Sequence, residues 1–166
     1  MEYWDIYDSN KQLTGRKMKR NDWHMQPGDY HLTVLALVKD EAGHILITQR
    51  KADKEWAPLS WEIPGGGVRT GESSFDAVLR EVREETGLAL TKEQGSCIFT
   101  YRSDSPEEQN NYFVDIYEFK APFTAKNVTV QESEVEAFKL ATAAEIHELG
   151  KQDQFLHYKR LAPLVK

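Results

Sequence analysis

The sequence predicts an α/β or α+β fold, in which helices pack against a mixed sheet. Three observations lead to this prediction. β-Rich apolar runs over 30–39, 44–50 and 111–120 have the length of strands. An amphipathic helix is predicted over 73–86, between these strands. Turn residues punctuate the chain between the runs, as at Asp40-Glu41-Ala42-Gly43.

An N-terminal hairpin precedes these strands. Its arms are predicted over 2–7 and 13–19, with Asp8-Ser9-Asn10 between them, and Pro27-Gly28 marks the turn that follows. The remaining predicted elements are strands over 96–101 and 135–141 and helices over 142–150 and 153–161. We interpret the chain as one domain, with a hairpin extension over 1–29 and a core over 30–166.

The helix over 73–86 carries the clearest local signals. Phe75, Val78, Leu79 and Val82 recur at helical spacing and form an apolar stripe wide enough to face a core. Ser73 with Asp76 resembles a capping box at the start. Gly87 follows the last turn, where a glycine in the left-handed conformation ends many helices.

Composition excludes several classes of protein. The chain has 166 residues, 40% of them hydrophobic, which is too apolar for a disordered chain. It has no run of roughly 20 apolar residues that would span a bilayer, so no membrane partner is expected. Twenty-one basic and 27 acidic residues give a net charge of −6, which argues against a nucleic-acid polymer as partner. An anionic small molecule remains possible if a divalent cation mediates.

Cysteine content bears on the compartment. Cys97 is the only cysteine, so an intrachain disulfide and a multi-cysteine zinc site are excluded. The first ten residues lack the pattern of a secretory signal. We therefore expect a cytoplasmic protein, with Cys97 as a small buried residue of a strand.

Three consecutive glycines follow Pro64. Gly65, Gly66 and Gly67 allow positive φ angles and let the backbone approach a ligand closely. Taken alone, they are also typical of a tight turn before a helix.

Acidic side chains share one side of the following helix. With Phe75 at zero and about 100° per residue, Glu81 lies near 240°, Glu84 near 180° and Glu85 near 280°. Like charges four residues apart repel, and a hard cation would remove that cost. Oxygen ligands favour Mg²⁺ or Mn²⁺ over zinc. The competing interpretation is a solvated acidic face with ion pairs to Arg80 and Arg83.

Glycines and acids together resemble a known motif. Gly66, five residues, Glu72, seven residues and then Arg80-Glu81-Val82-Arg83-Glu84-Glu85-Thr86-Gly87-Leu88 match the Nudix box over 66–88. The resemblance implies an α/β/α sandwich around a central mixed sheet, extending over about residues 30–161. It also implies hydrolysis of a diphosphate bond in a nucleoside diphosphate linked to another moiety, with water attacking phosphorus and Mg²⁺ or Mn²⁺ as cofactor.

The resemblance also implies roles for individual residues. Glu81 and Glu85 would be the principal metal ligands, Glu84 a further ligand or the group that positions water, and the carbonyl of Gly65 an additional ligand. Arg80 and Glu72 would form a pair that orients the helix and the glycine segment. A further acid often comes from outside the box, and Glu132 and Glu134 are the candidates.

Substrate signals are weaker. Arg50, Lys51 and Lys54 could approach phosphates, although such residues more often form a charged surface loop. Four aromatic residues could stack on a base, although strand aromatics more often belong to a core; they are Trp56, Trp61, Tyr112 and Phe113.

Two other functions remain open. Three segments resemble bacterial Nudix proteins grouped near isopentenyl-diphosphate isomerase, namely Trp4-Asp5-Ile6-Tyr7, Thr14-Gly15 and Tyr30-His31-Leu32. That enzyme uses a cysteine expected near Pro64, where this chain has none. The second alternative is a non-catalytic nucleotide-sensing module. The hairpin over 1–29 is expected to cover the site or to build a homodimer.

Overall fold

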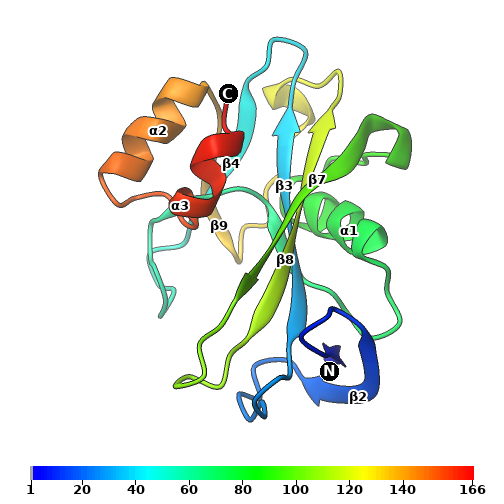
Figure 1. The fold of residues 1–166 in the computed structure, drawn as a ribbon. Coiled ribbons are helices and arrows are strands. Elements are labelled where there is room, and N and C mark those ends of the chain that lie inside the picture. The colour runs from blue at the N-terminus through cyan, green and yellow to red at the C-terminus, as the bar shows by residue number, and fades with distance from the viewer. Residues whose placement is uncertain (1) are drawn as a thin grey trace.

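A mixed sheet organises the chain, whose computed structural model describes residues 2–166 (Figure 1). Its strands run in the order β5-β4-β3-β8-β7, with β6 paired to β3 and β9 paired to β4. Strand β3 is parallel to β8 and antiparallel to β6, which confirms the mixed sheet. The strands are β3 (His31–Lys39), β4 (Ile45–Arg50), β5 (Trp61–Glu62), β6 (Gly65–Gly67), β7 (Gly95–Ser103), β8 (Tyr112–Lys120) and β9 (Val135–Ala141).

Helices cover both faces of this sheet. The helices are α1 (Ser74–Thr86), α2 (Ala143–Lys151) and α3 (Tyr158–Leu161), and three short 3₁₀ helices are η1 (Lys92–Gln94), η2 (Ala125–Asn127) and η3 (Ala162–Leu164). Val78 and Val82 of α1 belong to one apolar core, whereas Ile146 of α2 and Leu161 of α3 belong to another. The helices lie on opposite sides of the sheet in Figure 1, so the predicted three-layer sandwich is confirmed.

The central strand explains the uninterrupted apolar run in the sequence. Along β3, Val34 and Ala36 belong to the core under α1, whereas Leu35 and Leu37 belong to the core under α2 and α3. Alternate residues of a strand point to opposite faces, so a strand between two helical layers is apolar on both. Each buried aliphatic side chain of this kind contributes roughly 1.5–3 kcal/mol.

Helix α1 begins and ends where its local signals predict. The Ser73 hydroxyl accepts a hydrogen bond of 3.0 Å from the Asp76 N–H. Only this half of the capping box is present among the described contacts, because the Asp76 carboxylate pairs with Lys92 instead. At the other end Gly87 has φ 77°, and its N–H donates to the Arg83 carbonyl at 2.9 Å. The N-terminal cap at Ser73 fixes the direction in which α1 leaves the glycine segment.

The predicted N-terminal hairpin is also confirmed, with arms β1 (Tyr3–Tyr7) and β2 (Leu13–Lys19). It docks beside β3: Tyr7 bridges to Tyr30, and the Trp4 indole stacks on the His31 ring with centroids 4.3 Å apart. Trp4 is buried. The hairpin is thus packed onto the sheet rather than free.

Two predictions are wrong. Over 153–161, only α3 is helical, because Asp153 and His157 have positive φ angles and Phe155 is drawn into the core beside Trp61. Cys97 is exposed, not buried, because β7 is an edge strand whose residues 96–100 face solvent. Among the helices of residues 2–166, none combines the length and apolar character needed to cross a bilayer.

Candidate active site

The three glycines form a strand rather than a turn. Gly65–Gly67 make up β6, which pairs antiparallel with residues 33–35 of β3. None of the three has a positive φ angle and all lie in a strand, so the tight turn that they suggested is not formed. Their conformation is one that any residue adopts, and the requirement for glycine must come from their neighbours.

Each of these glycines is in close contact with a different neighbour. A Cβ atom on Gly65 would lie 2.1 Å from the carbonyl oxygen of Val34, inside the sheet. On Gly66 it would lie 2.6 Å from the Glu81 carboxyl, and on Gly67 2.7 Å from the Trp4 indole. The glycines therefore let the sheet, helix α1 and the hairpin converge on one segment of backbone.

Glu81 and Glu85 lie on the side of α1 that faces β6. Burial raises the pKa of Glu85 well above its usual range, and the negative charges of Glu81, Glu62 and Glu84 raise it further. The Gly65 N–H, 3.3 Å from Glu85 Oε2, acts in the opposite direction. Burial also raises the pKa of Glu81, although Arg80 opposes this. Several carboxyl groups thus lie close together in one partly enclosed place, where the negative charge of one raises the pKa of another.

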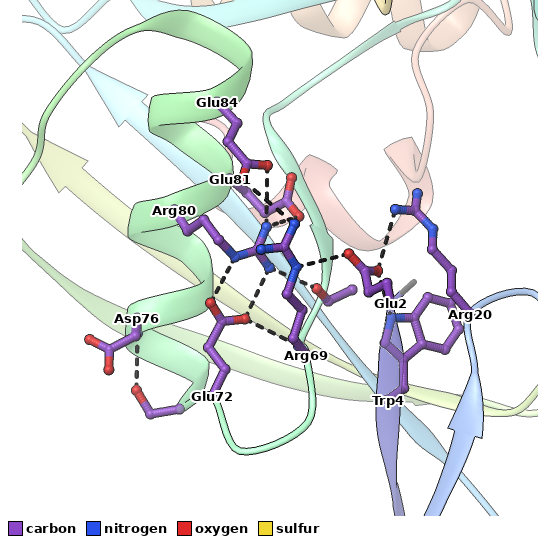
Figure 2. A network of polar contacts seen from close by, with 11 residues as sticks. Glu2, Trp4, Arg20, Arg69, Glu72, Asp76, Arg80, Glu81 and Glu84 are labelled. Atoms are coloured by element: carbon purple, nitrogen blue, oxygen red, sulfur yellow. Dashed lines mark hydrogen bonds and ion pairs between the residues drawn. The ribbon is translucent and has the colours of Figure 1, made fainter.

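Arg80 binds most of the acids around it (Figure 2). Its Nε–H and one Nη2–H donate to the two oxygens of Glu72 at 2.7 and 2.9 Å. Nη2 also donates to the Gly67 carbonyl at 3.1 Å, and Nη1 donates to Glu81 at 2.8 Å and to Glu84 at 3.3 Å. The implied pair between Arg80 and Glu72 is therefore present, and the bond from Arg80 to the Gly67 carbonyl ties α1 to β6.

The hairpin reaches the same place. The Arg69 Nε–H donates to Glu2 at 2.9 Å, and Arg69 lies 3.7 Å from Glu84. Glu2 also accepts from the Trp4 indole N–H at 3.0 Å and from Arg20 at 3.3 Å (Figure 2). Nothing in the local sequence predicts that Glu2 meets Arg69, because 67 positions of chain separate them.

A cleft of about 470 Å³ opens between these elements. Its charged and glycine lining comprises Glu2, Arg20, Arg50, Glu62, Gly65, Gly66, Arg69, Glu81, Glu84, Glu85 and Glu134. The cleft is thus polar, and it brings the predicted Glu81, Glu84 and Glu85 together with the backbone of Gly65 and Gly66.

Acids from outside the box meet the cleft unequally. Glu134 lines it and pairs with Lys54, whereas Glu132 is exposed and does not line it. Glu62 was not predicted: it lies on β5, is paired with Arg50 at 3.4 Å, and burial raises its pKa. A carboxylate in a strand otherwise facing a core was the signal that could have identified it.

The donor set fits a hard divalent cation. All donors are oxygens, and the Glu85 carboxyl has acidic neighbours rather than a paired cation. As they stand, Glu81 and Glu84 pair with Arg80, and within residues 2–166 no three acidic, histidine or cysteine side chains form a ready ligand group. An ion held by these residues would therefore require Glu81 or Glu84 to turn from Arg80 toward Glu85.

Known proteins resemble this chain over most of its length. An uncharacterized Nudix hydrolase of Listeria monocytogenes is 30% identical over 95% of this chain and 90% of its own. The solved structure of DR0079 from Deinococcus radiodurans has a TM-score of 0.75 at 19% identity, covering 99% of this chain and 97% of that one. A bifunctional NMN adenylyltransferase/ADP ribose pyrophosphatase of Francisella tularensis, complexed with AMP and Mn ion, has a TM-score of 0.64 at 25% identity, covering 81% and 41%.

A family model agrees with these likenesses. The model described as NUDIX domain matches residues 29–162. That range contains β3 to α3 and the cleft acids except Glu2. The chain belongs to the Nudix family and is a hydrolase of that family.

Proposed function

We propose that the cleft hydrolyses the diphosphate bond of a nucleoside diphosphate linked to another moiety, with a divalent metal ion as cofactor. Nudix hydrolases act on pyrophosphate bonds of nucleotide-like substrates. One observation carries the finer proposal: the half-buried Glu85 carboxyl, surrounded by Glu81, Glu84 and Glu62 beside the backbone of Gly65. Carboxyl groups so close together are charged at the same time only when cations lie beside them, as Arg80 does for Glu81 and as a metal ion would do for Glu85.

The proposed ligands are Glu81, Glu85 and Glu84, with the Gly65 carbonyl as a further one. Mg²⁺ or Mn²⁺ bound there would neutralise the diphosphate and lower the pKa of a bound water. The Francisella structure with a Mn ion and AMP supports this choice of cofactor.

Protein groups supply the remaining steps. Arg80 acts as a positioning residue, because its two hydrogen bonds to Glu72 and its bond to Gly67 fix the helix against β6. Glu84 is the most exposed of the three box acids and would orient the attacking water. Arg20, Arg50 and Arg69 line the cleft and offer charge to phosphate oxygens.

The test is a panel of nucleoside diphosphate derivatives with Mg²⁺ or Mn²⁺, in which products are identified and turnover is compared with that of Glu85→Gln. We expect wild-type hydrolysis that depends on the metal and is lost in the variant. Tight nucleotide binding without turnover would instead support the sensing module. Isomerisation of isopentenyl diphosphate would support the isomerase, which no comparison favours and for which Cys97 is not among the cleft residues.

The hairpin and the location complete the proposal. Glu2 and Arg20 line the cleft, which supports a covering role for the hairpin over 1–29. A homodimer and a cytoplasmic location remain parts of the proposal, the latter supported by the single cysteine. Sedimentation of the full chain tests the first.

A further inference from the structure

A second cavity adjoins the cleft. It has a volume of about 780 Å³, in the range of small-molecule sites. Five residues line both cavities, namely Arg20, Thr33, Leu35, Arg50 and His157. A molecule whose diphosphate lies in the cleft therefore has direct access to this second space, which we call the ring recess.

Aromatic rings wall the ring recess. Trp23, His31, Tyr112 and Trp56 line it, and the Trp23 and His31 centroids are 5.8 Å apart. The His31 and Tyr112 rings lie 5.3 Å apart. Phe113, by contrast, belongs to the core under α1, and Trp61 packs against the other core. Trp23 and Tyr112 are partly exposed and Trp56 is largely exposed, so these three rings can offer a face on which another flat ring stacks. His31 is buried and stacks on Trp4 instead.

His31 contributes a ring rather than a charge. Burial lowers its pKa to about 4, so the imidazole is neutral at physiological pH. Its Nε2 contacts Asn110 Oδ1 at 3.0 Å, which leaves the amide nitrogen of Asn110 unused by this contact. Asn110, Asn21 and Glu108 line the recess and offer groups that can bind the edge of a base.

The arginines of the ring recess lie where it joins the cleft. Arg20 and Arg50 line both, and the Arg50 guanidinium lies over the Trp56 ring at 5.1 Å from its centroid. Trp56 is 60% exposed, so its ring is accessible to a ligand. The arrangement runs from carboxylates through two arginines to aromatic faces, which matches metal, diphosphate and base in order.

We propose that the ring recess binds the nucleobase of the substrate, with Arg20 and Arg50 holding the diphosphate at its entrance. The inference rests on the proposed function, whose substrate class it specifies. Because Arg20 and Trp23 follow β2 directly, the N-terminal extension forms part of the binding site as well as a cover.

Calorimetric binding to the full chain tests this without any turnover. The probes are AMP, GMP, CMP and UMP, with ribose 5-phosphate as the matched ligand that has no base, all in Mg²⁺. We expect at least one nucleotide to bind about tenfold or more tightly than ribose 5-phosphate, as one stacking contact provides. Trp56→Ala should reduce that preference about tenfold without weakening ribose 5-phosphate binding.

Trp23→Ala should act in the same direction, and Phe99→Ala is the control, since Phe99 is exposed on β7 and lines neither cavity. Trp56 is exposed, so its removal should change stability little, which urea unfolding checks. Three results would contradict base binding in the ring recess. They are equal binding of all five ligands, no binding of any of them, and equal losses of nucleotide and ribose 5-phosphate affinity in Trp56→Ala. If the protein binds nucleotides through the base but does not hydrolyse them, only the proposed hydrolysis is contradicted. If it hydrolyses diphosphates without any dependence of binding on the base, only base binding in the ring recess is contradicted.

Discussion

The carboxylate of Glu81 occupies the space that a side chain on Gly66 would need, with the Cβ position only 2.6 Å from its Cδ. Helix α1 and strand β6 are therefore as close as glycine allows. The obstacle at Gly65 differs in kind, since there a Cβ would meet the backbone carbonyl of Val34 at 2.1 Å.

This difference predicts that alanine at Gly66 and alanine at Gly65 have different effects. Gly66→Ala should leave the free energy of unfolding within about 1 kcal/mol, because the Glu81 side chain can rotate away, but should weaken divalent-metal affinity about tenfold. Gly65→Ala should lower stability by more than about 3 kcal/mol, because backbone cannot yield as easily. Urea unfolding measures the stability of the two variants, and metal titration measures their affinity for the ion. Equal stability losses in the two variants would contradict this interpretation of the two contacts.

Arg80 should contribute more to stability than another arginine of its helix. Arg80→Met would leave Glu72, Glu81 and Glu84 without their shared cation, and Arg80 and Glu72 side chains are only 11% and 17% exposed. We expect a loss of roughly 3 kcal/mol in urea unfolding. The control is Arg83→Met, whose side chain is exposed on the same helix and which should cost less than about 0.5 kcal/mol. Similar losses for both would show that the network is not structural.

His31 should make folding sensitive to acid. Its folded pKa of about 4 lies below the ordinary 6.5, so between these values the unfolded chain binds more protons. The His31 contribution to stability is complete above pH 6.5 and decreases as pH falls toward 4, by up to about 3 kcal/mol.

The comparison that isolates this effect is His31→Phe, which keeps a ring beside Trp4 and removes the titration. Raised carboxyl pKa values at Glu81 and Glu85 act with opposite sign in the same range, and they are common to both proteins. Unfolding measured from pH 4 to 7 should show a smaller loss of stability in the variant. Parallel curves would contradict a neutral buried His31.

The further acid of the site should be Glu134 rather than Glu132. Glu134 lines the cleft beside Lys54, and Glu132 does not. Glu134→Gln should lower kcat about tenfold or more, as loss of an outer ligand or water-orienting group does. Glu132→Gln, two residues away, should stay within about twofold. The reverse order in steady-state kinetics would assign the role to Glu132.

Local signals predicted the elements that local interactions determine. Ser73 and Gly87 cap α1 as expected because their hydrogen bonds reach only three or four residues. Residues 153–157 carry helix-forming side chains, yet tertiary pairing prevails: the Trp61 N–H donates to Gln154 and the Leu156 N–H donates to Trp61. Propensity is a weak guide where distant backbone competes.

The candidate site divides in the same way. The box acids were predictable, because helical spacing brings Glu81 and Glu85 to one face. Glu62, Glu2 and Arg20 were not, because their places in the cleft depend on how β5 and the hairpin pack. The glycines were recognised for closeness to a ligand, whereas the structure shows closeness to Val34, Glu81 and Trp4.

The central claim is that Glu85 and Glu81 hold a divalent ion against a diphosphate. The most direct measurement is Mn²⁺ binding, followed by the loss of the free-ion paramagnetic resonance signal, in wild type, Glu85→Gln and the control Glu132→Gln. We predict that Glu85→Gln loses the cleft ion and at least about a hundredfold in hydrolysis while remaining folded, and that Glu132→Gln behaves as wild type. Unchanged Mn²⁺ affinity and unchanged turnover in Glu85→Gln would contradict the account.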